Sequence, residues 1–153
     1  MAYDLHREQW FPRPLDEVFA FFADAGNLEA ITPPWLGFEI LTPRPIAMRP
    51  GALIDYRLRL RGLPVRWRTE ISLWQPPHRF VDEQRRGPYR EWRHEHTFAA
   101  VDDGTLVRDH VRYQVPGGRL VHELFVRRDV ARIFDFRRDR LAQLLGDTAA
   151  AAR

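Results

Sequence analysis

The chain has 153 residues and a formal net charge of +3, with 44% hydrophobic and 29% charged residues. This composition is typical of a single globular domain, and the absence of cysteine excludes disulfides, thiolate metal sites and cysteine nucleophiles. No apolar run approaches the length of a membrane-spanning helix, and the opening "MAYDLHREQW" lacks the apolar stretch of a signal peptide, so we expect a cytoplasmic protein.

The first third of the chain predicts a strand followed by two short helices. The strand covers "YDLHREQWF", residues 3–11. Pro14 then opens a helix, because proline suits the first helical turn. A second short helix, "NLEAI" at 27–31, ends before Thr32-Pro33-Pro34, because proline interrupts helical hydrogen bonding.

A hairpin of two alternating strands follows a short strand, "FEILTP". The strands "ALIDYRLRLRG" and "LPVRWRTEISLW" flank a tight turn, which we place at Gly62-Leu63. This register pairs four residues of each strand on one face: Leu60 with Val65, Leu58 with Trp67, Tyr56 with Thr69, and Ile54 with Ile71. The opposite face then pairs arginines: Arg59 with Arg66, and Arg57 with Arg68.

A second hairpin contains "GPYREWRHEHTF" at 87–98, in which two histidines and two aromatic residues alternate with charged residues. The preceding strand, "RFVDEQ", has no fixed register, because the "QPPH" loop before it does not define one. With the turn at Asp103-Gly104, one face pairs as follows: Phe98 with Asp109, His96 with Val111, His94 with Tyr113, and Trp92 with Val115. Together the two hairpins predict an antiparallel sheet with one buried side.

The remainder of the chain, from about residue 119 to residue 145, predicts one long helix. Its apolar residues recur at helical spacing: Leu120, Leu124, Val130, Ile133, Phe134, Leu141 and Leu145. At ~1.5 Å per residue such a helix is about 40 Å long, enough to cross a whole sheet. Gly146 is a suitable cap, and we expect residues 147–153 to form a tail after one domain at 1–146.

The order strand, two short helices, six strands and one long helix resembles the START-like superfamily with the helix-grip fold, often labelled SRPBCC. Three stretches carry the resemblance: "NLEAITPPWLGFEI", "GPYREWRHEHTF", and "GTLVRDHVRYQVPGG" followed by "VRRDVARIFDFR". They are most similar to the bacterial polyketide cyclase/dehydrase-like branch. The resemblance implies an α+β fold in which a seven-stranded antiparallel sheet curls around the C-terminal helix, with a cavity between them for a small, mostly apolar ligand.

On this fold, the inner face of the sheet and the long helix supply the candidate ligand-binding residues. Aromatic side chains provide apolar area, and imidazoles provide a few oriented polar contacts. The candidates are Trp35, Tyr56, Trp67, Trp92, His94, His96, Asp109, Tyr113 and Phe134. We therefore expect a small hydrophobic or amphipathic molecule as the partner, and no cofactor.

Three interpretations of the paired histidines stay open. A His96–Asp109 pair, with His94 assisting, would suit a cyclase or dehydratase, because such a pair in a cavity can transfer protons near neutral pH. A metal site would need more ligands than two histidines, even with Asp109 as the third, so we expect no metal. The third interpretation is a buried hydrogen-bond network that fixes the strand register.

The outer face of the sheet offers a different class of function. All 24 basic residues are arginine, and four of them face one another across the first hairpin: Arg57, Arg59, Arg66 and Arg68. This block is either a patch for an anionic partner or a solvated face of mixed charge. Aspartates interrupt the basic C-terminal helix, so we expect no nucleic-acid partner. The other histidines lack partners in the pattern and are expected at the surface: His6, His78, His110 and His122.

Overall fold

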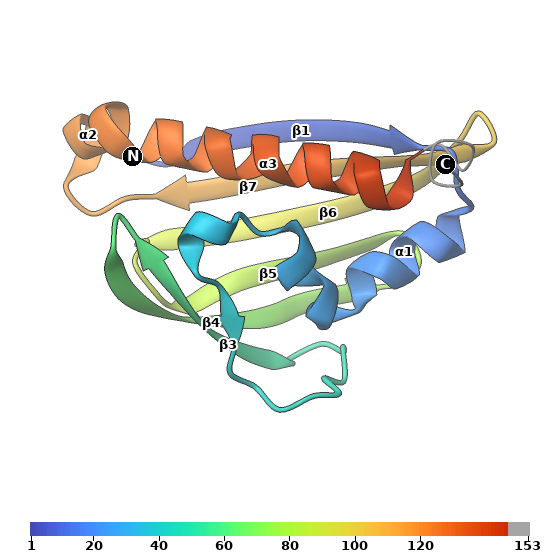
Figure 1. Cartoon of the computed structure of the whole chain (residues 1–153), viewed down its shortest axis with the longest axis horizontal. Helices are drawn as coiled ribbons and strands as arrows, with labels where there is room; N and C mark the ends of the chain where they lie inside the picture. Colours follow the sequence, from blue (N-terminus) through green and yellow to red (C-terminus); the bar gives the residue numbers. More distant parts are fainter. Residues whose placement is uncertain (147–153) are drawn as a thin grey trace.

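A seven-stranded antiparallel sheet curls around a long C-terminal helix in the computed structural model, which describes residues 1–146 (Figure 1). The strands are β1 Tyr3–Phe11, β2 Glu39–Ile40, β3 Leu53–Leu60, β4 Leu63–Gln75, β5 Arg79–Arg86, β6 Glu91–Val101 and β7 Gly104–Gln114. Their order across the sheet is β1-β7-β6-β5-β4-β3-β2. The predicted α+β helix-grip fold is therefore confirmed, and the expected tail at 147–153 lies outside the described residues.

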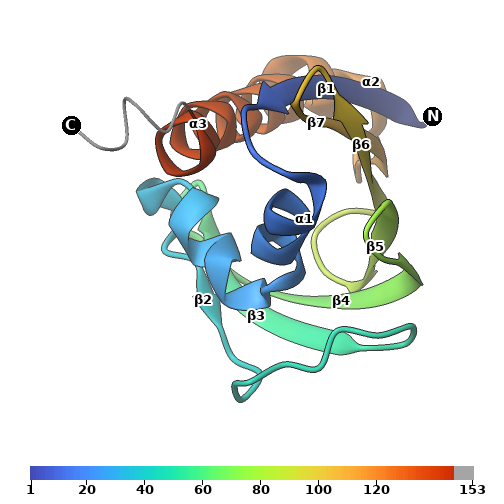
Figure 2. The ribbon, with the colours of Figure 1, turned by 90° about the vertical axis from the view of Figure 1, so that its right-hand side faces the viewer.

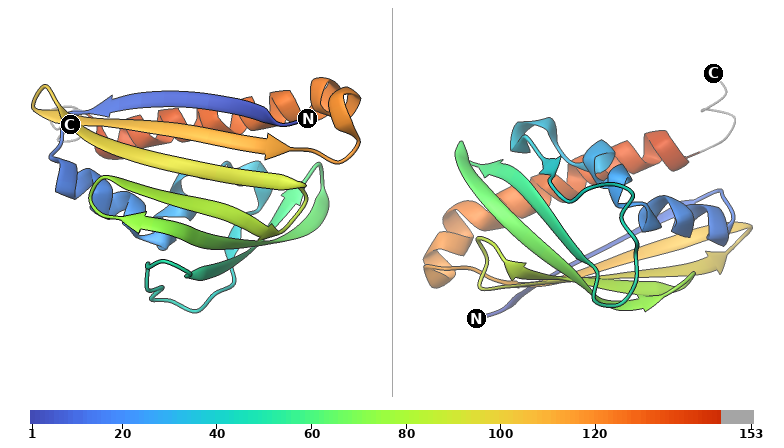
Figure 3. Two further views of the ribbon diagram at one scale, coloured as in Figure 1. Left: turned by 180° about the vertical axis from the view of Figure 1, so that it is seen from behind. Right: turned by 90° about the horizontal axis from the view of Figure 1, so that it is seen from below.

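The helices occupy the concave side of the sheet. They are α1 Leu15–Ala23, the 3₁₀ turns η1 Ala25–Ile31 and η2 Pro34–Leu36, α2 Gly118–Val121, the π-helical turn η3 His122–Val126, and α3 Arg127–Leu145. Seen end-on, the sheet bends from β1 and β7 through β5 to β4 and β3, and α1 lies in the space that it encloses (Figure 2). Within residues 1–146, no helix lies on the opposite face of the sheet (Figure 3). No helix within residues 1–146 is long and apolar enough to cross a membrane.

Both hairpin turns lie one residue earlier than the sequence predicted. Arg61 and Gly62 form the first turn and Asp102 and Asp103 the second, each with both residues at positive φ, from 48° to 80°. Two-residue hairpins favour this backbone because its twist matches that of the strands. The glycine in each predicted turn had suggested a later position, whereas here Arg61 and both aspartates adopt the left-handed conformation themselves.

The predicted cross-strand pairs are wrong by two residues, although the predicted faces are right. Side chains alternate with a period of two, so a two-residue shift leaves the buried face unchanged. The observed inner pairs are Leu58–Val65, Tyr56–Trp67 and Ile54–Thr69 in the first hairpin, and Phe98–Val107, His96–Asp109, His94–Val111 and Trp92–Tyr113 in the second. His96 thus lies directly opposite Asp109.

The long helix is interrupted by a π turn that changes which side chains face the sheet. The wide turn η3 places His122 in the interior, where its Nε2 lies 2.8 Å from the Tyr113 hydroxyl and its ring stacks on Tyr3. Leu120 and Leu124 are 69% and 56% exposed. The predicted burial of these two leucines and the predicted surface position of His122 are therefore wrong, because an extra residue in the turn shifts the helical phase.

Two of the four arginines in the block on the outer face pair with carboxylates. Within the first hairpin Arg57 faces Arg66, whereas Arg68 faces Asp55 and donates two hydrogen bonds to its carboxylate. Arg57 also donates to Glu39 at 2.5 Å. The predicted Arg57–Arg68 and Arg59–Arg66 pairs do not form, and Pro64 faces Arg59. Carboxylates therefore offset the charge of two arginines of the block, and both interpretations of this surface stay predictions.

Candidate functional site

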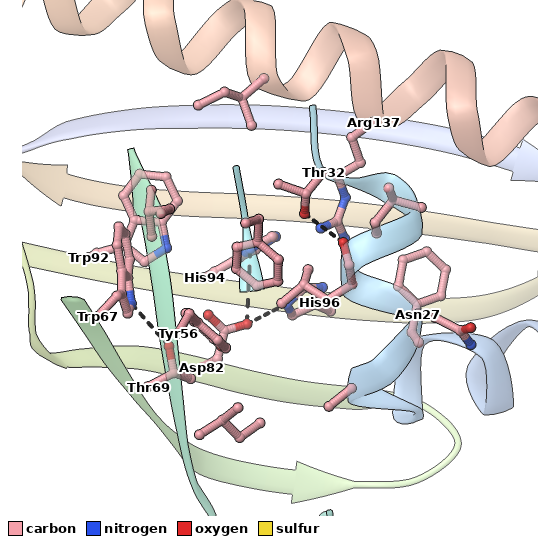
Figure 4. A pocket seen from close by; sticks show the side chains of 18 of the residues that line it. Asn27, Thr32, Tyr56, Trp67, Thr69, Asp82, Trp92, His94, His96 and Arg137 are labelled. Carbon is pink, nitrogen blue, oxygen red and sulfur yellow. Dashed lines mark hydrogen bonds and ion pairs between the residues drawn. The ribbon is translucent and has the colours of Figure 1, made fainter. Parts of the chain in front are cut away.

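A cavity with an open volume of about 200 Å³ lies between the sheet and α3. Its walls come from α1, η1 and η2, from strands β3 to β6, and from one face of α3. Most of the lining side chains are apolar. The buried carboxylate, imidazole and guanidinium groups lie on β5, β6 and α3, whereas polar side chains such as Asn27, Thr32 and Thr69 line the cavity from other parts of the chain (Figure 4). Pockets for drug-sized ligands usually measure ~300–1,000 Å³, so this cavity suits a smaller molecule.

Aromatic rings form one end of the cavity. Trp67 on β4 packs edge-to-face on Trp92 of β6 with 5.5 Å between ring centroids, and Tyr89 contacts both indoles at 5.6 and 4.8 Å. The Trp67 indole nitrogen donates to the Thr69 hydroxyl, 3.1 Å away. Such rings offer a flat ligand large apolar area with little loss of side-chain entropy, because each ring is already held by its neighbours.

Two histidine–aspartate hydrogen bonds cross the middle of the cavity wall. His94 Nε2 lies 2.7 Å from Asp109 on β7, and His96 Nε2 lies 2.7 Å from Asp82 on β5. The two imidazoles stack with their centroids 3.7 Å apart, and His96 also stacks on Phe80. Both histidines are at most 5% exposed, so the cluster operates in an environment that contains little water.

Burial and neighbouring charges set the protonation of this cluster. Burial lowers the pKa of His96 to about 4, and repulsion from the neighbouring His94 acts in the same direction, so the His96 ring is neutral at pH 7. Burial opposes ionisation of Asp82, but the His96 hydrogen bond and the nearby positive charges outweigh it and lower the pKa of that carboxyl. Burial opposes ionisation of Asp109 too, yet the Arg137 charge and the His94 hydrogen bond hold its pKa well below its usual range.

Arg137 brings an incompletely paired guanidinium into the cavity from α3. The residue is only 8% exposed, and its Nη2 lies 3.6 Å from Asp109, beyond good hydrogen-bond length. Within residues 1–146, its Nε and Nη2 atoms are buried and have no hydrogen-bond partner. The guanidinium carbon lies 5.5 Å from the ring centre of Phe22 and 5.8 Å from that of Phe134. Two buried donors therefore remain for a ligand.

Six of the nine predicted ligand-binding residues line the cavity: Tyr56, Trp67, Trp92, His94, His96 and Phe134. The other three lie elsewhere. Asp109 sits behind the histidines and contacts the cavity only through them and Arg137. Tyr113 is buried against His122, and Trp35 is 48% exposed, where it packs on Phe136. The predicted His96–Asp109 pair does not form a hydrogen bond, since His96 binds Asp82 and His94 binds Asp109.

Sequence reasoning missed two charged residues that line the cavity, Asp82 and Arg137. Asp82 lies in a strand in which Phe80 and Val81 are both apolar and both buried, so alternation does not reveal which face the carboxylate takes. A register shift between β4 and β5 adds to this ambiguity. Arg137 did leave a signal, because it lies three residues after Phe134 and four before Leu141, within the apolar stripe of the helix.

Comparison with known proteins agrees with this architecture. CV1439 from Chromobacterium violaceum is 14% identical with a TM-score of 0.73, covering 95% of this chain and 99% of its own. Protein Ms6760 from Mycobacterium smegmatis is 19% identical with a TM-score of 0.68, covering 93% and 90%. A START superfamily protein from the same organism is 12% identical with a TM-score of 0.66, covering 92% and 98%. These likenesses show the fold alone.

A match to a family model shows which family the chain belongs to, whereas the solved structures show only its fold. No curated protein matches the chain. The model described as polyketide cyclase / dehydrase and lipid transport matches residues 11–141, which include nearly every element around the cavity. The chain therefore belongs to the polyketide cyclase / dehydrase and lipid transport family.

Proposed function

We propose that the chain binds a small, mostly apolar molecule that carries a carbonyl oxygen, with its apolar part against the tryptophans and its oxygen at Arg137. The observation that carries the proposal is the pair of buried, unsatisfied donors on Arg137 at the wall of an apolar cavity. A buried donor without an acceptor costs about 1–3 kcal/mol, and a ligand oxygen removes that cost. The family description, which includes lipid transport, fits an apolar ligand.

The charges around the cavity favour a neutral oxygen over a carboxylate. Asp82 and Asp109 together carry two negative charges, and the Arg137 guanidinium supplies one positive charge. A ligand carboxylate would bring a third negative charge close to the two aspartates, in surroundings of low dielectric constant. A carbonyl accepts the Arg137 hydrogen bonds without that repulsion.

Filling the cavity should abolish binding. Leu58 on β3 lines the cavity, whereas Leu53 on the same strand does not and is exposed. We expect Leu58→Trp to weaken binding of 2-acetonaphthone, a bicyclic aromatic ketone, by about tenfold or more, because the indole occupies ligand volume. Tryptophan fluorescence quenching measures the affinity, circular dichroism checks folding, and Leu53→Trp is the control. Equal binding by both variants would contradict a ligand site in this cavity.

A second candidate function, proton transfer to or from the bound ketone, is favoured by the position of His96 and Asp82. Both line the cavity and share a hydrogen bond, so the Asp82 carboxylate can take a proton from the carbon beside a carbonyl while His96 holds that carboxylate in place. We expect the protein to accelerate deuterium exchange at that carbon by about 100-fold or more over the free ketone. Proton NMR in D₂O measures the rate. His96→Gln should remove the acceleration and the exposed control His78→Gln should not; a rate equal to that of the free ketone counts against catalysis.

A further inference from the structure

Three side chains on adjacent strands direct ligand atoms at one point of the cavity wall. Asp82 on β5 and His94 and His96 on β6 each offer one donor atom, and these atoms all lie within 4.8 Å of one another. All three residues line the cavity (Figure 4). The sequence alone offered two histidines with Asp109 as the third ligand, but the observed strand pairing places Asp82 directly opposite His94.

The hydrogen bonds of the cluster fix which ring nitrogens face this point. A carboxylate can only accept, so the hydrogen shared at 2.7 Å between His94 Nε2 and Asp109 belongs to the histidine. In the neutral form of the His94 ring, Nδ1 presents its lone pair to Asp82, whose Oδ2 lies 4.0 Å away. Two electron pairs thus face one another with no hydrogen between them.

His96 shows the same mismatch on its other side. When its Nε2 donates to Asp82, its Nδ1 carries a lone pair that lies 3.5 Å from the Asp109 carboxylate. Within the described part of the chain, this buried Nδ1 has no hydrogen-bond partner. In the other tautomer of His96 the hydrogen is on Nδ1 and points at Asp109. Nε2 then directs a lone pair at Asp82. Three lone-pair donors would converge on one point.

A cation at that point satisfies all of these groups together. Zinc binds histidine nitrogen and carboxylate oxygen at ~2.0–2.2 Å, so tetrahedral ligand atoms lie about 3.3 Å apart. The observed separations from Asp82 Oδ2, 4.0 Å to His94 and 2.7 Å to His96, lie on either side of this value. Asp109 would accept a hydrogen from each histidine, the arrangement that orients metal-bound imidazoles in proteins. The two carboxylates that contact the histidines also attract a cation.

We propose that Asp82, His94 and His96 bind one divalent transition-metal ion, such as Zn²⁺, with Asp109 orienting both histidines. Two histidines and one carboxylate leave at least one coordination position, and the cavity lies beside them. A ligand carbonyl held by Arg137 could take that position and be polarised by the ion. This last role rests on the proposed function; the metal site itself does not.

A clean test must first remove a second histidine cluster. Asp4, His6 and His110 also place ligand atoms within 4.8 Å of one another, but on the exposed edge of the sheet. The surface-cleared variant, His6→Ala with His110→Ala, eliminates that competitor. We expect it to bind one Zn²⁺ per chain in competition with a chromophoric chelator, and to bind Co²⁺ with visible absorption bands typical of low coordination number.

Substitutions in the surface-cleared variant locate the ion. Asp82→Asn should weaken Zn²⁺ binding by about 100-fold or more, and Asp109→Asn by about 10- to 100-fold. Glu83→Gln, the next residue on β5, should change nothing, and His94→Gln provides a second ligand variant if Asp82→Asn unfolds. Failure to bind stoichiometric metal, or binding that survives both ligand substitutions, would overturn the proposal. Ketone binding measured in EDTA tests the proposed function separately, because it depends on Leu58 and Arg137 and not on the ion.

Discussion

The Asp109→Asn variant should be less stable than the parent chain by about 3–5 kcal/mol, because it removes one partner of a buried ion pair and leaves the other charged. Arg137 would retain its guanidinium in an apolar cavity with its nearest carboxylate gone. Asparagine is nearly isosteric and can still accept the His94 hydrogen bond at 2.7 Å in the parent. The loss in unfolding free energy therefore measures the effect of the Asp109 charge and not of the side-chain shape.

Equilibrium urea unfolding in the presence of EDTA measures this difference without interference from metals. Asp55→Asn is the matched control, because Asp55 also pairs with an arginine, here through hydrogen bonds of 2.8 and 3.2 Å, but lies at the surface. Exposed pairs contribute about 0–1 kcal/mol, so this control should unfold almost like the parent. A loss below about 1 kcal/mol for Asp109→Asn would mean that Arg137 finds another carboxylate or solvent, contrary to its buried position.

The Arg137→Leu variant should bind 2-acetonaphthone about 10- to 100-fold more weakly, because hydrogen bonds to a charged group contribute about 1.5–3 kcal/mol. The matched hydrocarbon 2-ethylnaphthalene has no acceptor oxygen, so its affinity should hardly change. Arg138→Leu, the next residue on α3, removes an exposed guanidinium and should affect neither molecule. Equal losses for the ketone and the hydrocarbon would show that Arg137 shapes the cavity and does not recognise the oxygen.

A double variant tests whether Arg137 and Asp109 stabilise the fold through direct contact with each other. Arg137→Leu leaves Asp109 charged, whereas Arg137→Leu with Asp109→Asn removes both members of the pair. The two losses in unfolding free energy should therefore sum to clearly more than the loss in the double variant, since contacting charges are coupled by about 0.5–3 kcal/mol. Strict additivity would argue against direct contact between the two groups.

The sequence predicted the fold well because the fold depends on patterns that tolerate small errors. The alternation in β3, β4, β6 and β7 identified the buried faces even though each hairpin was placed two residues out of register. The site depends on which residues pair across the strands, and the predicted pairs were wrong. Whether His96 lies opposite Asp109 or Val111 follows from a turn in which Asp102 takes a positive φ, and no hydrophobic pattern encodes that choice.

The remaining errors have equally local causes. Asp82 could not be assigned to a face because its strand has adjacent buried apolar residues and follows a register shift. The exposure of Leu120 and Leu124 follows from a single π turn, which helical periodicity cannot foresee. Arg137 could have been predicted as a site residue, since a charged side chain within an apolar stripe must either face solvent or find a partner.

The Arg137–Asp109 contact also has a consequence for how the helix docks. An apolar stripe on α3 would pack almost equally well after sliding by one turn, about 5.4 Å, because leucine, valine and phenylalanine fit many neighbours. Sliding would carry the guanidinium away from Asp109 and press it against Val111 or Val107, which are fully buried. We infer that this buried contact, together with the Arg7–Asp135 and Arg61–Asp129 pairs at the surface, favours a single alignment of helix on sheet and so fixes the wall of the cavity that α3 forms.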